Sequence, residues 1–233
     1  MVGAGRANEG LRADWQSQLR EVVEVQGFRY VRFHGLFHDD MFVYRENADG
    51  AVEPSFQYVD LLFDALLDAA IRPFVELGFM PREIATQTAT AFWWGAHGSP
   101  PTDFDKWEQL AARTVEHWRD RYGIDEIRTW YYEVWNEPDL RPFFSGTKTQ
   151  YPDMYARAVR AVKAVDPHLR VAGPATSNFV PDTRFDGETE DTSAQADTLS
   201  ADDLDTLDRQ PVWLQEFLDV AHRDLLPVDF VSS

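Results

Sequence analysis

The chain has 233 residues, of which 44% are hydrophobic and 14% aromatic, enough apolar material for one α/β domain with a sizeable core. A formal net charge of −18 argues against nucleic-acid partners, because a surface that follows phosphates needs clustered Lys and Arg. The absence of Cys excludes disulfides, a thiol nucleophile and a thiolate metal site, and a cytoplasmic location is expected.

No membrane partner is expected either. No segment approaches the roughly 18 consecutive apolar residues of a membrane span, and residues 1–6 lack the apolar centre of a signal peptide. The acidic balance suits a neutral or weakly charged small substrate better than an anionic one. The oligomeric state stays open, a homo-oligomer included.

Hydrophobic spacing divides most of the chain into alternating helices and strands. In chain order, we predict a helix at 15–26, a strand at 28–33, a helix at 59–70, a strand at 71–76, a helix at 107–122, a strand at 130–135, a helix at 154–165, a strand at 169–174, a helix at 211–225 and a strand at 228–233. Such an alternation predicts βα units and a parallel sheet. It accounts for about five and a half units, whereas a closed barrel has eight.

Four stretches lie outside this repeat. The Gly-containing residues 3–10 predict a flexible turn, and Asn47–Gly50 predicts the turn of a small hairpin at the rim. Residues 86–101, rich in Thr, Gly and Pro, predict a long loop over the barrel mouth. The segment from Asn178 to Gln210 carries ten acidic residues against two basic ones, so we predict a mobile surface insertion there.

The strand at 130–135 ends in an amide, a carboxylate and a proline, which are Asn136, Glu137 and Pro138. Proline cannot extend the strand pairing, so the polar residues lie at its carboxyl end. That edge of a parallel barrel holds the chemistry, and a carboxylate walled by Trp135 is a candidate general acid with a raised pKa. The alternative is a Glu that caps a loop or pairs with an Arg.

The run Trp135-Asn136-Glu137-Pro138 resembles the acid/base signature at the end of barrel strand four in the large clan of retaining glycoside hydrolases. Together with residues 30–41, 74–81 and 228–233, it resembles glycoside hydrolase family 39, the β-xylosidase and α-L-iduronidase family. The resemblance covers nearly the whole chain except the acidic insertion. It implies an incomplete (β/α)8 TIM barrel, one partial catalytic domain over residues 1–233, that starts at or just after strand one and reaches strand six.

The resemblance also implies the activity and the site. It predicts a retaining, exo-acting β-xylosidase that needs no metal or organic cofactor, with Glu137 as acid/base, Asn136 holding the sugar 2-hydroxyl and His34 binding the sugar. The nucleophile of the family comes from strand seven, which these residues do not supply. Two alternatives stay open, an α-L-iduronidase-like enzyme and a non-catalytic carbohydrate-binding remnant. Uronate recognition needs cations that the loops do not obviously offer, which favours a neutral xyloside.

Three further groups have two interpretations each. Trp93 and Trp94 can stack on a sugar or pack the 86–101 loop down, and Trp94 is kept as a candidate substrate-binding residue. Residues 38–40, His-Asp-Asp, could imitate a metal cluster, but a loop of this composition is usually solvated or bonded to backbone, so no metal is expected. Glu76 could be taken for the catalytic partner of Glu137, but residues of adjacent strands do not flank a sugar from opposite sides, so it is interpreted as structural or as a support behind the residues that touch the sugar.

Overall fold

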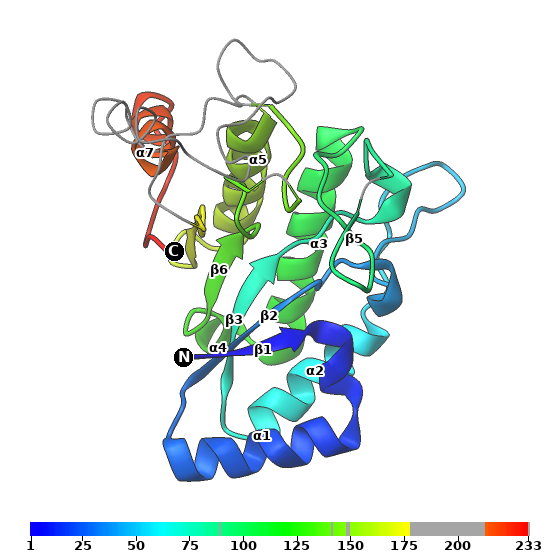
Figure 1. Cartoon of the computed structure of the whole chain (residues 1–233), viewed down its shortest axis with the longest axis vertical. Coiled ribbons are helices and arrows are strands. Elements are labelled where there is room, and N and C mark those ends of the chain that lie inside the picture. Colours follow the sequence, from blue (N-terminus) through cyan, green and yellow to red (C-terminus); the bar gives the residue numbers. More distant parts are fainter. Residues whose placement is uncertain (89, 141, 148–149, 178–212, 233) are drawn as a thin grey trace, which may run out of the picture.

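The computed structural model describes residues 1–88, 90–140, 142–147, 150–177 and 213–232. Its main feature is a five-stranded parallel sheet whose strand order follows the chain (Figure 1). The strands are β1 (Val2–Arg6), β2 (Tyr30–His34), β3 (Arg72–Leu77), β6 (Tyr131–Val134) and β7 (Arg170–Ala172). Parallel neighbours in sequential order, each followed by a crossover, form the wall of a (β/α)8 barrel.

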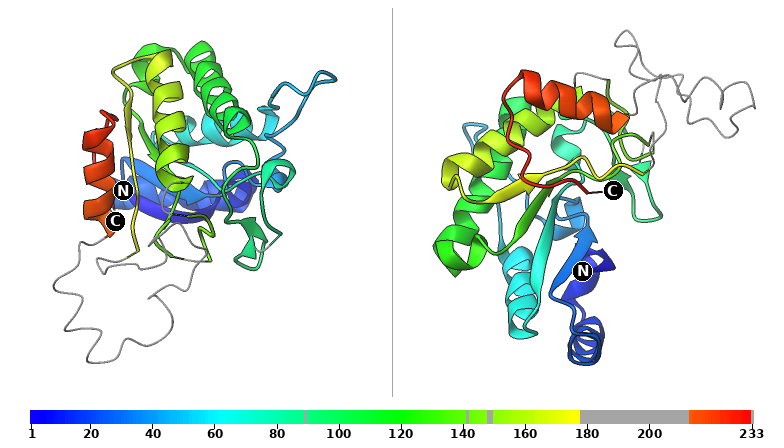
Figure 2. Two further views of the ribbon diagram at one scale, coloured as in Figure 1. Left: turned by 90° about the horizontal axis from the view of Figure 1, so that it is seen from above. Right: turned by 90° about the vertical axis from the view of Figure 1, so that its left-hand side faces the viewer.

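Helices connect the strands and gather on one side of the sheet, as the two views of Figure 2 show. They are α1 (Ala13–Gln26), α2 (Gln57–Asp68), α3 (Phe104–Tyr122), the short α4 (Ile124–Ile127), α5 (Gln150–Val165) and α7 (Trp213–Arg223). Asp103 caps α3, since its Oδ1 accepts from the amide of Asp105 at 2.9 Å. Gly27 ends α1 in the left-handed region at φ 66°. Within the described ranges, no helix is long and apolar enough to cross a membrane.

Strand alternation separates a helix-covered face from a polar face. In β2, Val31 and Phe33 are buried under the helices, whereas Arg32 and His34 point to the other side. Pairing of β3 with β6 places Glu76 opposite Glu133 on the same polar face. This face is the inside of the barrel wall, so its charged side chains come together near the carboxyl ends of the strands.

The core lies between the sheet and the helices. Its largest fully buried side chains are Trp107, Trp118, Trp130, Trp135, Tyr132, Tyr151, Tyr155, Phe33, Phe37, Phe63 and Phe79. Phe63 of α2 stacks on Trp118 of α3 with ring centroids 4.8 Å apart, which joins two neighbouring helices. The wider core also includes Leu19 of α1 and Trp213 and Phe217 of α7, so every βα unit from the first to the fifth contributes to it.

Two predictions at the ends of the chain were wrong. Residues 2–6 form β1 and not a flexible turn, because parallel pairing with β2 stabilises an extended backbone that Gly3 and Gly5 do not favour by themselves. Residues 228–232 are not a strand, although the Asp229 amide donates to the Val171 carbonyl of β7 at 3.1 Å. This segment therefore runs beside β7 without regular pairing.

Several smaller features differ from the predictions or add to them. In α1, Leu19 is buried, whereas Val22, about one turn further along, is 36% exposed. The loop at 86–101 contains a hairpin of β4 (Thr90–Ala91) and β5 (Ala96–His97), and α4 was not predicted. The predicted turn at Asn47–Gly50 is confirmed by the bridge between Glu46 and Val52. The acidic insertion from Asn178 to Gln210 lies outside the described residues.

Candidate active site

The backbone just after β6 is held in an unusual conformation. Trp135 and Glu137 have φ values of 75° and 45°, in the left-handed region that side chains other than glycine rarely adopt. Their amides are fixed on two sides: the Trp135 amide donates to the Leu77 carbonyl at 3.1 Å, and the Glu137 amide donates to the Ala175 carbonyl at 2.9 Å. Strain of this kind persists only where the surroundings enforce it, and it is concentrated at functional sites.

The indole of Trp135 anchors this turn in the core. It is fully buried, and its Nε1 donates to the Phe143 carbonyl at 2.8 Å. Its ring lies edge-on to Phe79 at 5.3 Å and to Trp107 of α3 at 6.3 Å. The position of Asn136 and Glu137 is therefore set by a side chain that cannot move without disturbing the helix layer.

The carboxyl group of Glu137 is half-buried at the end of β6. Burial, together with the negative charge of Asp139, raises its pKa above the ordinary value, and the positive charges of His34 and Arg32 only partly oppose this. Within the described ranges, this carboxyl group accepts no hydrogen bond and forms no ion pair. A carboxyl group that holds its proton to higher pH and has no fixed partner is suited to general acid catalysis.

Asp139 is itself buried and ordered. Its carboxylate accepts from the amide of Ser177 at 2.9 Å and from the Ser177 hydroxyl at 3.0 Å. The same stretch of chain supplies the Ala175 carbonyl that accepts from the Glu137 amide. Asp139 therefore affects Glu137 through its charge and through the loop that it holds.

Below this turn, Arg32 is the centre of a buried ion network. Its Nε and Nη2 lie 2.7 and 2.5 Å from Glu133 Oε2, and its Nη2 lies 3.0 Å from Glu76 Oε2. The same Nη2 donates to Asn136 Oδ1 at 2.8 Å. Glu133 also accepts from the Ser232 hydroxyl at 2.5 Å. One guanidinium thus connects β2, β3, β6 and the turn that carries Glu137.

His34 extends the network towards the mouth of the barrel. Its Nδ1 lies 2.7 Å from Glu76 Oε2. Burial disfavours the charged ring, but the negative charge of Glu76 and this hydrogen bond outweigh it and raise the pKa of His34. The structure therefore brings Glu137, Asn136 and His34 to one edge of the sheet and joins the last two through Glu76 and Arg32.

The predicted aromatic residues, Trp93 and Trp94, lie in the turn of the β4–β5 hairpin. Trp94 is partly buried, with Phe92 stacked on it at 5.2 Å and His38 edge-on at 4.7 Å. Trp93 is 82% exposed and has the Arg6 guanidinium 4.9 Å from its ring. Trp94 therefore packs the hairpin onto the barrel edge, and its role as a substrate ligand stays a prediction.

Phe92 is an exposed aromatic ring that stacks on His34. It is 41% exposed, stacks on His34 at 5.6 Å and on Phe143 at 4.9 Å, and has a φ of 58°. Sequence reasoning placed Phe92 on the loop but assigned it no role. The exposed aromatic surface next to the network is thus larger than Trp94 alone.

Residues 38–40 are engaged in local hydrogen bonds. His38 Nδ1 lies 2.8 Å from Asp40 Oδ1, and Asp39 accepts from the Arg82 amide at 3.0 Å. Asp40 also pairs with Arg6 of β1 at 2.6 Å. Among the described residues, no group of His, Asp or Glu side chains is arranged to hold a metal ion.

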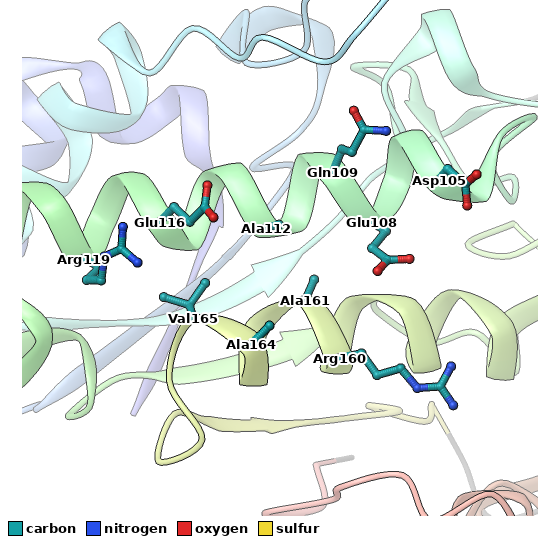
Figure 3. A pocket seen from close by; sticks show the side chains of 10 residues that line it. All are labelled: Asp105, Glu108, Gln109, Ala112, Glu116, Arg119, Arg160, Ala161, Ala164 and Val165. Carbon is teal, nitrogen blue, oxygen red and sulfur yellow. The ribbon is translucent and has the colours of Figure 1, made fainter.

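A groove of about 630 Å³ lies elsewhere, on the outer surface between α3 and α5 (Figure 3). Small side chains such as Ala112 and Ala161 line it between Glu108 and Arg160. It contains none of the residues of the network, so its size does not mark the site.

Three residues of the candidate site were missed by sequence reasoning: Arg32 and Glu133 of the network, and Asp139 beside Glu137. Glu76 was assigned a role that is structural or that supports the sugar-binding residues, and its contacts with Arg32 and His34 agree with that interpretation. The signal for Arg32 and Glu133 was present, because a charged residue in the middle of a buried parallel strand needs a partner inside the protein. Asp139 had no such signal, since it lies in a loop.

Known proteins resemble this chain over most or all of its length. The family model for Glycosyl hydrolases family 39 matches residues 1–233. A beta-xylosidase of Geobacillus stearothermophilus is 40% identical over 235 residues, which cover 99% of this chain and 41% of the relative. An alpha-L-iduronidase of Mus musculus is 26% identical over 178 residues, which cover 70% of this chain and 25% of the relative.

The fold has solved counterparts as well. The crystal structure of a monomeric beta-xylosidase from Caulobacter crescentus CB15 matches with a TM-score of 0.80 and 36% identity, covering 99% of this chain and 40% of that one. The predicted fold class, a partial TIM barrel, is confirmed by this likeness and by the parallel sheet. The chain spans about two fifths of the length of the beta-xylosidases it matches.

Proposed function

Because the chain belongs to Glycosyl hydrolases family 39, we propose that it forms the acid/base side of a retaining glycosidase site that hydrolyses β-xylosides. The observation that carries the proposal is the state of Glu137. It lies at the carboxyl end of the fourth barrel strand, half-buried, with a raised pKa and a backbone fixed by two neighbouring segments. Retaining hydrolysis needs a general acid in this condition.

The reaction has two steps. In the first, Glu137 gives its proton to the glycosidic oxygen as the bond to the sugar breaks, and a carboxylate nucleophile bonds to the anomeric carbon. In the second, Glu137, now a carboxylate, takes a proton from the water that displaces the enzyme from the sugar. The family resemblance assigns the nucleophile to the seventh barrel strand. Glu76 and Glu133 are both paired with Arg32 and take no covalent part.

Sugar binding is assigned to three side chains at the same edge. Asn136 holds the 2-hydroxyl and His34 a neighbouring hydroxyl, which is supported by their common connection to the Arg32 network. Trp94 supplies apolar contact, with Phe92 as the more exposed ring beside it. Apolar C–H groups of a pyranose suit such a surface.

A xyloside is preferred over an iduronide as substrate. Identity with the Geobacillus beta-xylosidase extends over the whole chain, whereas the mouse alpha-L-iduronidase matches only part of it at lower identity. The two sugars differ by the C5 carboxylate, so rates on 4-nitrophenyl β-xyloside and on an iduronide separate them. A higher kcat/KM for the iduronide would overturn the xyloside assignment.

The proposal is tested with Glu137→Gln in the complete-barrel protein, meaning this chain continued by the remaining barrel strands. Gln keeps the shape and hydrogen-bonding reach of Glu but has no proton to transfer. We expect hydrolysis of glycosides with poor leaving groups to fall by about 10² to 10⁴-fold. The first step on a dinitrophenyl glycoside should stay fast, a glycosyl-enzyme should accumulate, and azide should restore turnover because an anionic nucleophile needs no base.

Asp166→Asn is the matched control, because Asp166 is a carboxylate paired with Arg128 away from the barrel mouth. It should change neither the leaving-group dependence nor the response to azide. Equal impairment of Glu137→Gln on good and poor leaving groups, with no effect of azide, would remove Glu137 from the acid/base role. A complete-barrel protein without activity on any glycoside would support the non-catalytic alternative.

A further inference from the structure

We propose that Arg32 and Glu76 form a single positioning unit that orients both predicted sugar ligands, Asn136 and His34, so that each presents an N–H donor to the substrate. The inference rests on the proposed function and deepens it. It assigns a role to an ion pair inside the barrel wall that does not itself touch the sugar. The evidence is the direction of the hydrogen bonds.

The contact between Arg32 and Asn136 decides the orientation of the amide. A guanidinium can only donate hydrogen bonds, so the Asn136 atom 2.8 Å from Arg32 Nη2 must be the carbonyl oxygen. The amide nitrogen then lies on the other side, where it can donate to a sugar oxygen. Without Arg32, rotation of the terminal amide by half a turn would cost little and would present the wrong atom.

The contact between Glu76 and His34 decides the protonation of the imidazole. The Glu76 carboxylate can only accept, so His34 Nδ1, 2.7 Å from Glu76 Oε2, carries the proton. Nε2 is then the ring atom left for a ligand. The negative charge of Glu76 also raises the pKa of His34, which favours a donor at Nε2 as well.

The unit is rigid because its side chains are buried and each is held by more than one contact. The Glu76 side chain is fully buried, and that of Arg32 is 17% exposed. Glu133 holds both Nε and Nη2 of Arg32, which leaves the guanidinium plane no freedom to turn. A Lys ammonium has the charge but not the planar fork, so it cannot pair with Glu133 and reach Asn136 in the same fixed geometry.

The two oxygens of the Glu76 carboxylate have different surroundings. Oε1 is buried and has no hydrogen-bond partner in the described part of the chain, while Oε2 of the same carboxylate serves both Arg32 and His34. All the pairing of Glu76 thus passes through one oxygen that links the two ligands. A disturbance of Arg32 is therefore transmitted to His34, and a disturbance of Glu76 to Asn136.

The first test measures whether Arg32 acts through the sugar 2-hydroxyl. In the complete-barrel protein, kcat/KM is determined for a 4-nitrophenyl β-xyloside and for its 2-deoxy analogue. The parent should prefer the 2-hydroxyl substrate strongly, since contacts to this group strengthen in the transition state. In Arg32→Lys this preference should shrink by about tenfold or more, because the Asn136 amide is no longer held in the donating orientation.

Arg72→Lys is the matched control. Arg72 also lies on a barrel strand and forms a two-bond ion pair, with Glu126, but at the opposite end of β3. The 2-hydroxyl preference of this variant should equal that of the parent. If Arg32→Lys lowers kcat/KM by the same factor on both substrates, Arg32 has a structural role only and the proposal is overturned.

The second test does not depend on catalysis. In Glu76→Gln the hydrogen bond to His34 Nδ1 can persist, but the charge is removed, so the pKa of His34 followed by NMR titration should fall. An unchanged pKa of His34 would overturn the Glu76 half of the proposal. If the parent hydrolyses neither substrate, the proposed function fails, while the titration still decides whether Glu76 controls His34.

Discussion

Gly98 lies where the β4–β5 hairpin contacts the backbone of Pro142 and Phe143, in the loop that follows Glu137. Gly98→Ala should force these two segments apart. Gly98 follows β5, and its carbonyl accepts from the Ser145 amide at 2.8 Å. A Cβ atom there would lie 2.7 Å from the Pro142 carbonyl oxygen and 2.9 Å from the Phe143 carbonyl oxygen. Both obstacles are backbone atoms, so no side-chain rotation relieves the clash.

The cost follows from these contacts. Ordinary carbon–oxygen contacts begin near 3.4 Å, so the two segments must separate by several tenths of an ångström. Overpacking of this kind costs about 1 to 3 kcal/mol. The Phe143 carbonyl also accepts from Trp135 Nε1, and weakening this partly buried hydrogen bond adds about 1 kcal/mol. The free energy of unfolding should therefore fall by about 2 to 4 kcal/mol.

The assay is urea unfolding of the complete-barrel protein, followed by tryptophan fluorescence. Gly3→Ala is the matched control, because a Cβ atom on Gly3 of β1 would meet nothing within 4 Å. Its free energy of unfolding should stay unchanged or rise by up to about 1 kcal/mol, since Ala restricts the unfolded chain. A Gly98→Ala protein that unfolds within about 0.5 kcal/mol of the parent would refute the reasoning.

Two further predictions concern the acid and the open sheet. Asp139→Asn removes a negative charge that raises the pKa of Glu137, while the contacts to Ser177 can persist. Glu137 should then lose its proton at lower pH, so the alkaline limb of the pH profile of kcat/KM should move to lower pH. An alkaline limb that stays in place or moves to higher pH would contradict this. A polypeptide limited to residues 1–233 exposes the edge of β1 and covers the edge of β7 only with the irregular segment 228–232, so it should aggregate. A monomer in gel filtration with a sharp thermal transition would show that the edges are tolerated.

The order of helices and strands and the position of Glu137 could be predicted from the sequence. Apolar residues at a spacing near 3.6 indicated the helices, and short runs of aromatic and β-branched residues indicated the strands, so β3 and β6 were located to within two residues. Asn136 and Glu137 follow a buried strand directly, and a proline closes it. Such local patterns predict helices and strands correctly where the formation of an element depends mainly on residues that are close in the sequence.

The edges of the sheet could not be predicted in the same way. Gly3 and Gly5 have the composition of a turn, and only pairing with β2, about 29 positions away in sequence, makes residues 2–6 a strand. Residues 228–232 have the composition of a strand but make only one backbone bond to β7. Whether a marginal segment is extended and paired depends on the neighbour that the fold provides.

The contacts between the side chains of the candidate site were decided by the tertiary structure alone. The sequence by itself determined that His34, Asn136 and Glu137 lie at the carboxyl ends of strands, and therefore share one edge of a parallel sheet. It did not determine that Arg32 would reach Glu133, which is 101 positions away, or that Asp139 would act on Glu137. Ion pairs inside a barrel depend on strand register and on which face each residue occupies, and these are set only when the whole sheet has assembled.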